Sequence, residues 1–133
     1  MGGNKELITY RLARARETLD EARLMADSNH WHGCVNRLYY ACFYSVNALL
    51  LKDGLSSSKH SGVRSLFNKQ YVMTGLVPKE LATLYNTLFD TRQEADYEDL
   101  FSIDSSEVRI WLEQAVYFID HVTSLVLISP SAD

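Results

Sequence analysis

The sequence predicts an all-α protein, an up-and-down helical bundle of four main helices plus a shorter helix. Apolar residues recur at helical spacing along the whole chain. Only 2 prolines and 6 glycines occur among the 133 residues, too few for the turns of an all-β fold. With 47% apolar and 23% charged residues, the composition is typical of a packed domain. We expect a single domain over residues 1–133, with its core at about residues 5–127.

The first predicted helix covers about 23 residues and ends before Ser28-Asn29, which can also cap the next helix. Its charged positions include Arg16–Asp20 and Arg23–Asp27, which have the i,i+4 spacing of helical ion pairs. We therefore expect an outer helix with one solvated face. A single apolar stripe forms the other face: Ile8, Leu12, Ala15, Leu19, Ala22 and Ala26.

The second predicted helix begins near His30 and runs to about Lys52, where Asp53-Gly54 ends it. Between residues 34 and 51, 14 of 18 residues are apolar, and Arg37 is the only charged residue among them. A helix that is apolar on all sides belongs at the centre of a bundle. We therefore expect this helix to be the central one.

A shorter helix is predicted from about Lys59 to Val72, after possible N-caps at residues 56–58. Pro78 suits the first turn of a fourth helix, and the polar, acidic stretch from Gln93 to Asp104 is predicted to be a solvated loop. The core stripe of the fourth helix is Leu81, Leu84, Tyr85 and Leu88.

The last helix is predicted to start at Asp104, because Glu107 follows at capping-box spacing. Its core stripe is Val108, Trp111, Leu112, Ala115, Phe118, Ile119, Val122 and Leu125.

The charge balance excludes a protein that coats nucleic acid through an overall positive charge, because the net charge is −4. Any contact with nucleic acid must come from a local basic cleft. The chain has no Gly-rich phosphate loop, no GxSxG and no HExxH, and we expect no metal and no cofactor. Cys34 and Cys42 would lie about 12 Å apart along a helix, so two buried thiols are expected. No apolar run reaches the length of about 18 residues that spans a membrane, and a cytoplasmic protein is expected.

Arg92 is the clearest polar residue at a core-facing position, four residues after Leu88 and seven after Tyr85. A guanidinium stays charged, so it needs solvent, a carboxylate or a phosphate. Two interpretations stay open. Arg92 is either an anion-binding residue at the mouth of a cleft or a last-turn arginine that complements the helix dipole and pairs with Asp96.

Arg37 and His60 are the other candidates. Tyr40 and Tyr44 follow Arg37 at i+3 and i+7, so Arg37 either stacks on these rings as a structural residue or lines a site for phosphate. His60 begins the third helix, where the helix dipole disfavours a charged imidazole. It either acts as a neutral base or only packs and caps.

Three motifs, in this order, resemble the HEPN domain, whose name stands for "higher eukaryotes and prokaryotes nucleotide-binding". They are residues 36–44 (NRLYYACFY), residues 59–62 (KHSG) with Phe67 after them, and residues 92–97 (RQEADY). The resemblance covers about residues 5–127 and is closest to the small stand-alone bacterial and archaeal members. It implies a helical bundle that forms a homodimer, with a cleft where the protomers meet.

The resemblance also implies an activity and a partner. Many family members are metal-independent ribonucleases whose signature is an arginine followed four to six residues later by a histidine. Here Arg92 takes the place of the arginine, and Tyr97 stands where the histidine is expected. Small members are often encoded beside a minimal nucleotidyltransferase that neutralises them in a toxin–antitoxin pair.

Three hypotheses follow. The first is a homodimeric binding module, part of a toxin–antitoxin-like pair, that engages a nucleotide, RNA phosphate or a nucleotidyltransferase partner. The second is a toxin ribonuclease in which Arg92 stabilises charge and His60 or Tyr97 transfers protons. The third is a purely structural dimerisation module. The predicted binding residues are Arg37, Tyr40, Tyr44 and Asp96, and the predicted catalytic residues are Arg92, Tyr97 and His60.

Overall fold

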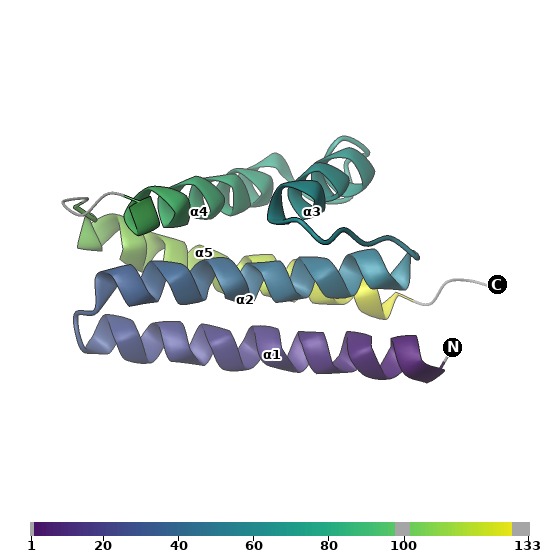
Figure 1. Cartoon of the computed structure of the whole chain (residues 1–133), viewed down its shortest axis with the longest axis horizontal. Helices are drawn as coiled ribbons and strands as arrows, with labels where there is room; N and C mark the ends of the chain where they lie inside the picture. The colour runs from purple at the N-terminus through teal and green to yellow at the C-terminus, as the bar shows by residue number, and fades with distance from the viewer. Residues whose placement is uncertain (1, 98–101, 129–133) are drawn as a thin grey trace.

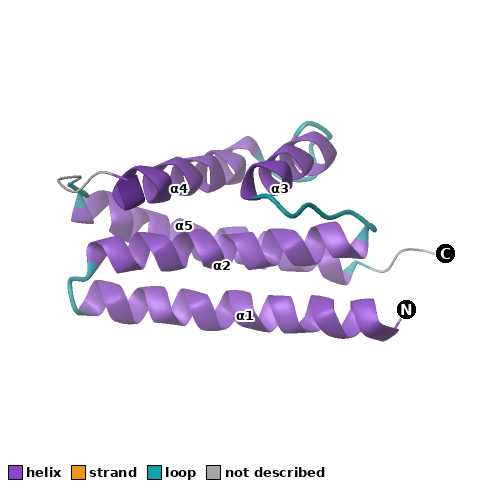
Figure 2. Cartoon of the chain, viewed as in Figure 1, coloured by secondary structure: helices purple, strands orange, loops and turns teal. Residues whose placement is uncertain are grey.

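The computed structural model describes residues 2–97 and 102–128, and the regular structure in this part of the chain is entirely helical, as predicted (Figures 1 and 2). In chain order the elements are α1 (Gly2–Asp27), α2 (Trp31–Lys52), α3 (His60–Phe67), the π-helical segment η1 (Asn68–Val72), α4 (Lys79–Tyr97) and α5 (Ser105–Leu127).

The central helix is α2, as its composition predicts. It packs against each of the other four α-helices, with α1 and α5 along its length and α3 and α4 across its upper side in Figure 1. Twelve of its residues are buried. Both cysteines are free and buried within it, which confirms that prediction. No helix in the described ranges is long and apolar enough to span a lipid bilayer.

The core next to the middle of α2 is aromatic. Tyr39 of α2 stacks on Tyr85 of α4 with ring centroids 5.9 Å apart, and Tyr85 stacks on Phe118 of α5 at 5.8 Å. Phe67 of α3 lies edge-on to Tyr85 at 5.4 Å. All four side chains are fully buried. This core connects α2, α3, α4 and α5, and it thereby fixes the position of the residues that surround Tyr39.

Helix α4 is longer than predicted. The sequence suggests a loop from Gln93, but the helix continues to Tyr97. Residues 93–95 are good or adequate helix formers, and Arg92 pairs with Asp96 one turn later at 3.4 Å. Residues 98–101 of the predicted loop lie outside the described residues. Arg92 is therefore not in the last turn of α4, so the helix-dipole part of that interpretation is wrong, whereas its pairing with Asp96 is confirmed.

Other local predictions are partly right. The N-cap of α5 is confirmed, because the Asp104 side chain accepts a hydrogen bond from the Ser106 backbone N–H at 2.9 Å. Asn29 ends α1 with a φ of 60°, but the N-cap residue of α2 is His30, which forms no side-chain capping bond.

The ion pairs predicted within α1 are not the ones that form. Arg16 pairs with Asp120 of α5 at 2.7 Å, and Arg23 pairs with Asp20 at 3.5 Å. The Arg16–Asp120 pair depends on how α1 docks against α5, which spacing within one helix does not encode.

Candidate functional site

A cluster of arginines and aromatic rings lies where α2 meets α1, α3 and α4. Tyr39 and Phe43 form one row along α2, and Tyr40 and Tyr44 form the neighbouring row, because residues four apart share a helix face. We call this set the arginine–aromatic cluster; it consists of Arg14 of α1, Arg37, Tyr39, Tyr40, Phe43 and Tyr44 of α2, His60 of α3 and Arg92 of α4.

His60 is held on three sides by rings of α2. Its imidazole stacks on Phe43 with centroids 4.5 Å apart and an interplanar angle of 6°. Tyr40 meets it edge-on at 5.8 Å. The Tyr39 hydroxyl lies 2.7 Å from His60 Nδ1, within hydrogen-bond distance. The first residue of α3 is therefore fixed in position and orientation by α2.

Burial changes the proton affinities of this pair. The pKa of His60 is lowered, first by burial and then by the positive charge of Arg92. Burial raises the pKa of Tyr39 to about 12. At neutral pH both groups are therefore uncharged, and they are joined through a single short contact.

Arg92 is the least satisfied arginine of the cluster. Its Cζ lies 4.6 Å from the centroid of the Tyr39 ring and 5.8 Å from that of Tyr40, in cation–π geometry. Its side chain is only 14% exposed, and its one ion pair joins Nη1 to Asp96 at 3.4 Å. Nε is buried with no hydrogen-bond partner among the described residues. Nη2 also has no such partner, yet it is not among the buried atoms, so it reaches solvent.

Arg37 differs from Arg92 because its donors are used inside the protein. Its Nε and Nη2 donate to Asn36 Oδ1 at 3.2 and 2.7 Å, and its Nη1 donates to Glu21 of α1 at 3.3 Å. Its Cζ lies 5.5 Å from the centroid of the Tyr40 ring. Arg37 therefore links α1 to α2 and supports Tyr40, whereas Arg92 has donors left for a ligand.

The cluster extends to α1 through a residue that sequence reasoning missed. Arg14 Cζ lies 5.3 Å from the Tyr44 ring centroid, and Tyr44 in turn lies 6.1 Å from Tyr40. Glu17 pairs with Arg14 at 3.0 Å. Only the position of Arg14 beside the apolar stripe of α1 could have signalled this role, since the contact depends on the docking of α1 on α2.

Tyr97 lies outside the contacts of the cluster. Its side chain is 84% exposed, and it forms no ring contact or hydrogen bond with the described residues. Because α4 is still helical there, five residues turn Tyr97 by about 140° from Arg92 around the helix axis. Asp96, at i+4, is the residue that shares the face of Arg92.

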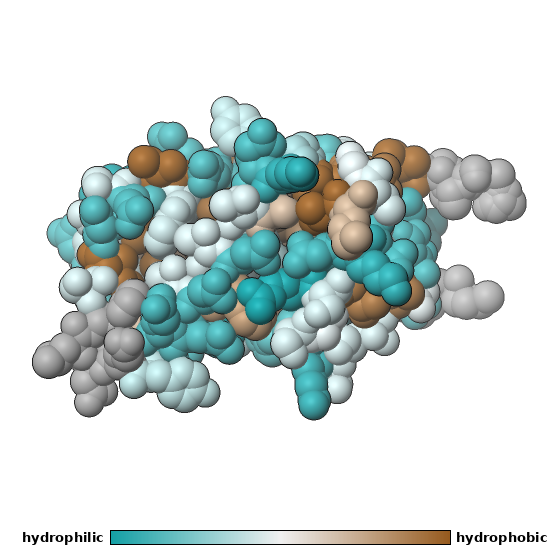
Figure 3. All heavy atoms as spheres, turned by 90° about the horizontal axis from the view of Figure 1, so that it is seen from above, coloured by the Kyte–Doolittle hydropathy of each residue, from teal (hydrophilic) through white to brown (hydrophobic). Residues whose placement is uncertain are grey.

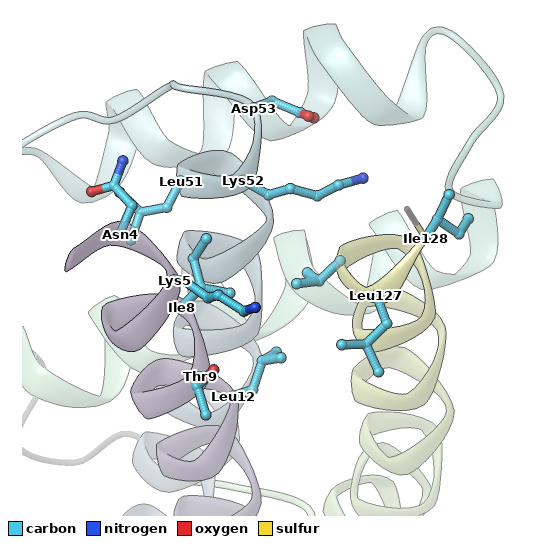
Figure 4. A pocket seen from close by; sticks show the side chains of 11 residues that line it. Asn4, Lys5, Ile8, Thr9, Leu12, Leu51, Lys52, Asp53, Leu127 and Ile128 are labelled. Atoms are coloured by element: carbon cyan, nitrogen blue, oxygen red, sulfur yellow. The ribbon is translucent and has the colours of Figure 1, made fainter. Parts of the chain in front are cut away.

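A separate cavity lies at the end of the bundle that holds the first turns of α1 and the last turns of α2 and α5. It measures about 620 Å³. Figure 4 shows Lys5, Leu12 and Leu127 directed into it from α1 and α5. No residue of the arginine–aromatic cluster lines it. The described ranges contain no group of three or more potential metal ligands. The face over α3 and α4 is largely hydrophilic, with separate apolar patches (Figure 3).

A pH-dependent stability follows from the environment of His60. The unfolded chain takes up a proton on this residue near its ordinary pKa of about 6.5, whereas the folded protein resists protonation until a lower pH. The contribution of His60 to the free energy of unfolding is therefore expected to be at its highest above about pH 6.5 and to fall as the pH drops below that value. Urea unfolding at pH 7.5 and 5.5 should show a smaller fall for His60→Gln than for the wild type.

The control for this prediction is His30→Gln, which changes an exposed histidine just before α2 whose side chain forms no capping bond. This variant should keep the wild-type fall in stability between the two pH values. Equal falls in His60→Gln and wild type would show that His60 does not carry the effect.

Comparisons with known proteins agree on one family. A model described as the HEPN domain matches residues 8–125. A protein of Thermotoga maritima named "UPF0332 protein" is 44% identical over 126 residues, which cover 95% of this chain and 96% of the relative. Two proteins of Methanocaldococcus jannaschii, each named "Putative toxin", are also similar. One is 32% identical over 82% of this chain and 74% of its own length. The other is 29% identical over 89% of this chain and 87% of its own length.

Proposed function

This chain belongs to the HEPN domain family, and on that premise we propose that it is a toxin-like member that binds single-stranded RNA through the arginine–aromatic cluster. The names of the two Methanocaldococcus relatives support the toxin-like part of the proposal. The family resemblance adds two further parts, a homodimer that brings two such clusters together and a minimal nucleotidyltransferase that acts as the neutralising partner.

The unused hydrogen-bonding capacity of Arg92 is the observation that carries this proposal. A guanidinium offers five N–H donors, and this one makes a single 3.4 Å ion pair with Asp96, whose side chain is 51% exposed. A phosphate group offers oxygen acceptors that match the planar guanidinium in geometry and charge. Arg92 is therefore suited to a phosphate that joins or displaces Asp96.

The rings beside Arg92 favour a single-stranded nucleic acid over a free phosphate. Tyr40, Phe43 and Tyr44 are partly exposed and lie in one continuous series of ring contacts. Proteins recognise single-stranded RNA by stacking its bases on such rings and on arginine planes while basic groups hold the backbone. The cluster thus places stacking surfaces and phosphate donors side by side, even though the net charge of the chain is −4.

The stacking part of the proposal has a direct test. Tyr40→Ala should weaken binding of a fluorescent single-stranded RNA 12-mer about tenfold, because one stacked base contributes about 1–3 kcal/mol. Fluorescence anisotropy titration in EDTA measures the affinity. Tyr10→Ala is the matched control, since it removes a tyrosine of α1 that is 61% exposed and lies outside the cluster. Equal affinities of the two variants would contradict base stacking on Tyr40.

A ribonuclease is the second candidate, and the position of His60 favours it. The family signature histidine is absent after Arg92, but His60 reaches the same two tyrosine rings from α3. Cleavage by the RNA 2′-hydroxyl needs a base, an acid and positive charge on the phosphate. Arg92 supplies the charge, and the protonation of His60 decides whether the remaining roles can be filled.

A further inference from the structure

The contact between Tyr39 and His60 bears on which ring nitrogen of the imidazole carries the proton. A neutral imidazole has one N–H donor and one acceptor nitrogen, and its tautomer is set by the partner of the other nitrogen. Here the 2.7 Å contact joins the Tyr39 hydroxyl to Nδ1. Either the hydroxyl donates to Nδ1 and the imidazole proton lies on Nε2, or Nδ1 carries the proton and donates to the hydroxyl oxygen.

Burial of Tyr39 distinguishes these two arrangements. The Tyr39 side chain is fully buried, and among the described residues His60 is the partner within hydrogen-bond distance of its hydroxyl. If Nδ1 donated, the hydroxyl proton of Tyr39 would need another acceptor. The hydroxyl of the stacked Tyr85 is the nearest candidate; it is buried with no other partner in the described part of the chain. Burial and the interaction with Tyr39 both raise the pKa of Tyr85, the second as expected where Tyr85 is the donor and Tyr39 the acceptor. Directing the Tyr39 proton there would leave the Tyr85 proton unpaired, at the cost of a lost buried hydrogen bond.

The other ring nitrogen faces a different environment. Among the described residues Nε2 has no hydrogen-bond partner, and it is not one of the buried unpartnered atoms, so it reaches solvent. Arg92 Nη2 reaches solvent in the same way, and both side chains contact Tyr39 and Tyr40. Because the two groups are neighbours, the positive charge of Arg92 also lowers the pKa of His60.

We propose that Tyr39 is a positioning residue that holds His60 in the neutral tautomer with its proton on Nε2, so that His60 serves as a hydrogen-bond donor beside Arg92 for a phosphate oxygen. The identity of the ligand in this inference rests on the proposed function. The tautomer of His60 does not, because it is a property of the free protein.

The consequence for catalysis is specific. To act as a base, Nε2 would have to lose its proton and Nδ1 would have to gain one. If the Tyr39 hydroxyl turned to accept from Nδ1, a buried hydroxyl proton would again be left unpaired. If Nδ1 instead took the proton of Tyr39, a buried tyrosinate would remain. The pKa of Tyr39, raised to about 12, opposes that transfer at neutral pH. To act as an acid, the ring would first have to be protonated, which burial and the charge of Arg92 oppose, because a neutral imidazole gives up its last N–H proton only at a pH far above neutral. The tautomer therefore fits binding and not RNA cleavage.

The test is a long-range ¹H–¹⁵N NMR spectrum of the histidine rings at pH 7.5, with His60 assigned by its loss in His60→Gln. We expect a protonated Nε2 and an unprotonated Nδ1. A ring protonated on Nδ1, or on both nitrogens, would overturn the proposal. This measurement needs no ligand, so it succeeds or fails separately from RNA binding.

Two variants test the role of Tyr39. Tyr39→Phe should give a mixture of tautomers at His60 and bind the single-stranded RNA 12-mer about three- to tenfold more weakly, as expected for one lost hydrogen bond. Tyr71→Phe is the matched control, because it removes a buried tyrosine hydroxyl that donates to Asp53 outside the arginine–aromatic cluster, and it should keep the wild-type tautomer and RNA affinity. An unchanged tautomer and affinity in Tyr39→Phe would overturn the positioning role. No RNA binding by wild type, with the tautomer as stated, would overturn the donor role and the proposed function together.

Discussion

Replacing Arg92 with alanine is expected to weaken binding of single-stranded RNA by about 10- to 150-fold, the largest effect on binding that we expect from a single substitution. The range corresponds to the loss of one hydrogen-bonded charged contact of about 1.5–3 kcal/mol. Arg92 has N–H donors without a partner among the described residues, whereas the donors of Arg37 already bind Asn36 and Glu21. Anisotropy titrations at several salt concentrations should also show the salt dependence reduced by about one phosphate contact.

Arg109→Ala is the matched control for this prediction. It removes the same charge and a similar ring contact, with Arg109 Cζ 4.9 Å from the ring centroid of Trp31, but it lies outside the arginine–aromatic cluster. Its RNA affinity should stay within about twofold of wild type, the effect of a distant charge under salt screening. An Arg92→Ala protein that keeps its helical circular dichroism and binds as tightly as Arg109→Ala would refute the role of Arg92.

Replacing Phe118 with alanine is expected to lower the free energy of unfolding by about 3–5 kcal/mol. The ring is fully buried and contacts Tyr85 at 5.8 Å and Phe67 at 5.8 Å. These two rings connect α3 and α4 to the core, and the surrounding helices cannot collapse into the space that Phe118 fills without moving them. Urea unfolding followed by circular dichroism measures the loss.

The neighbouring residue offers a control for the core. Tyr117 precedes Phe118 on α5 but is 70% exposed, so Tyr117→Ala should change stability by no more than about 0.5 kcal/mol. Similar losses in both variants would mean that α5 does not bury the face that contains Phe118. A further effect on RNA affinity is expected only for Phe118→Ala, because Tyr85 stacks on Tyr39 and Tyr39 holds His60.

The fold could be predicted from the sequence to a large extent, because its helices are specified by local patterns. The all-apolar stretch of α2 requires burial on every side, and α2 is the helix that all the others cover. The end of α4 could not be predicted, since Gln93 and Glu94 suit a solvated helix as well as a loop. The predicted partner of Arg16 was wrong because Asp120 of α5 pairs with it instead. The spacing of residues within one helix does not indicate such a partner.

The sequence indicated most residues of the candidate site but not the contacts between them. Arg92, His60 and Tyr40 are brought together as the motifs indicate, and Asp96 pairs with Arg92. The Tyr39–His60 contact depends on how α3 docks on α2, and the place of Arg14 beside Tyr44 depends on α1. Tyr97 is the predicted residue that the fold leaves apart, because α4 remains helical through it. Its role as a catalytic residue stays a prediction.

The central claim is that the arginine–aromatic cluster binds single-stranded RNA without cutting it. The most direct measurement titrates the wild-type protein into an end-labelled single-stranded RNA 12-mer in EDTA, then recovers the RNA and separates it on a denaturing gel. Saturable binding with the RNA recovered intact is the predicted result. Shortened products ending in a 2′,3′-cyclic phosphate, or no binding at all, would contradict the account.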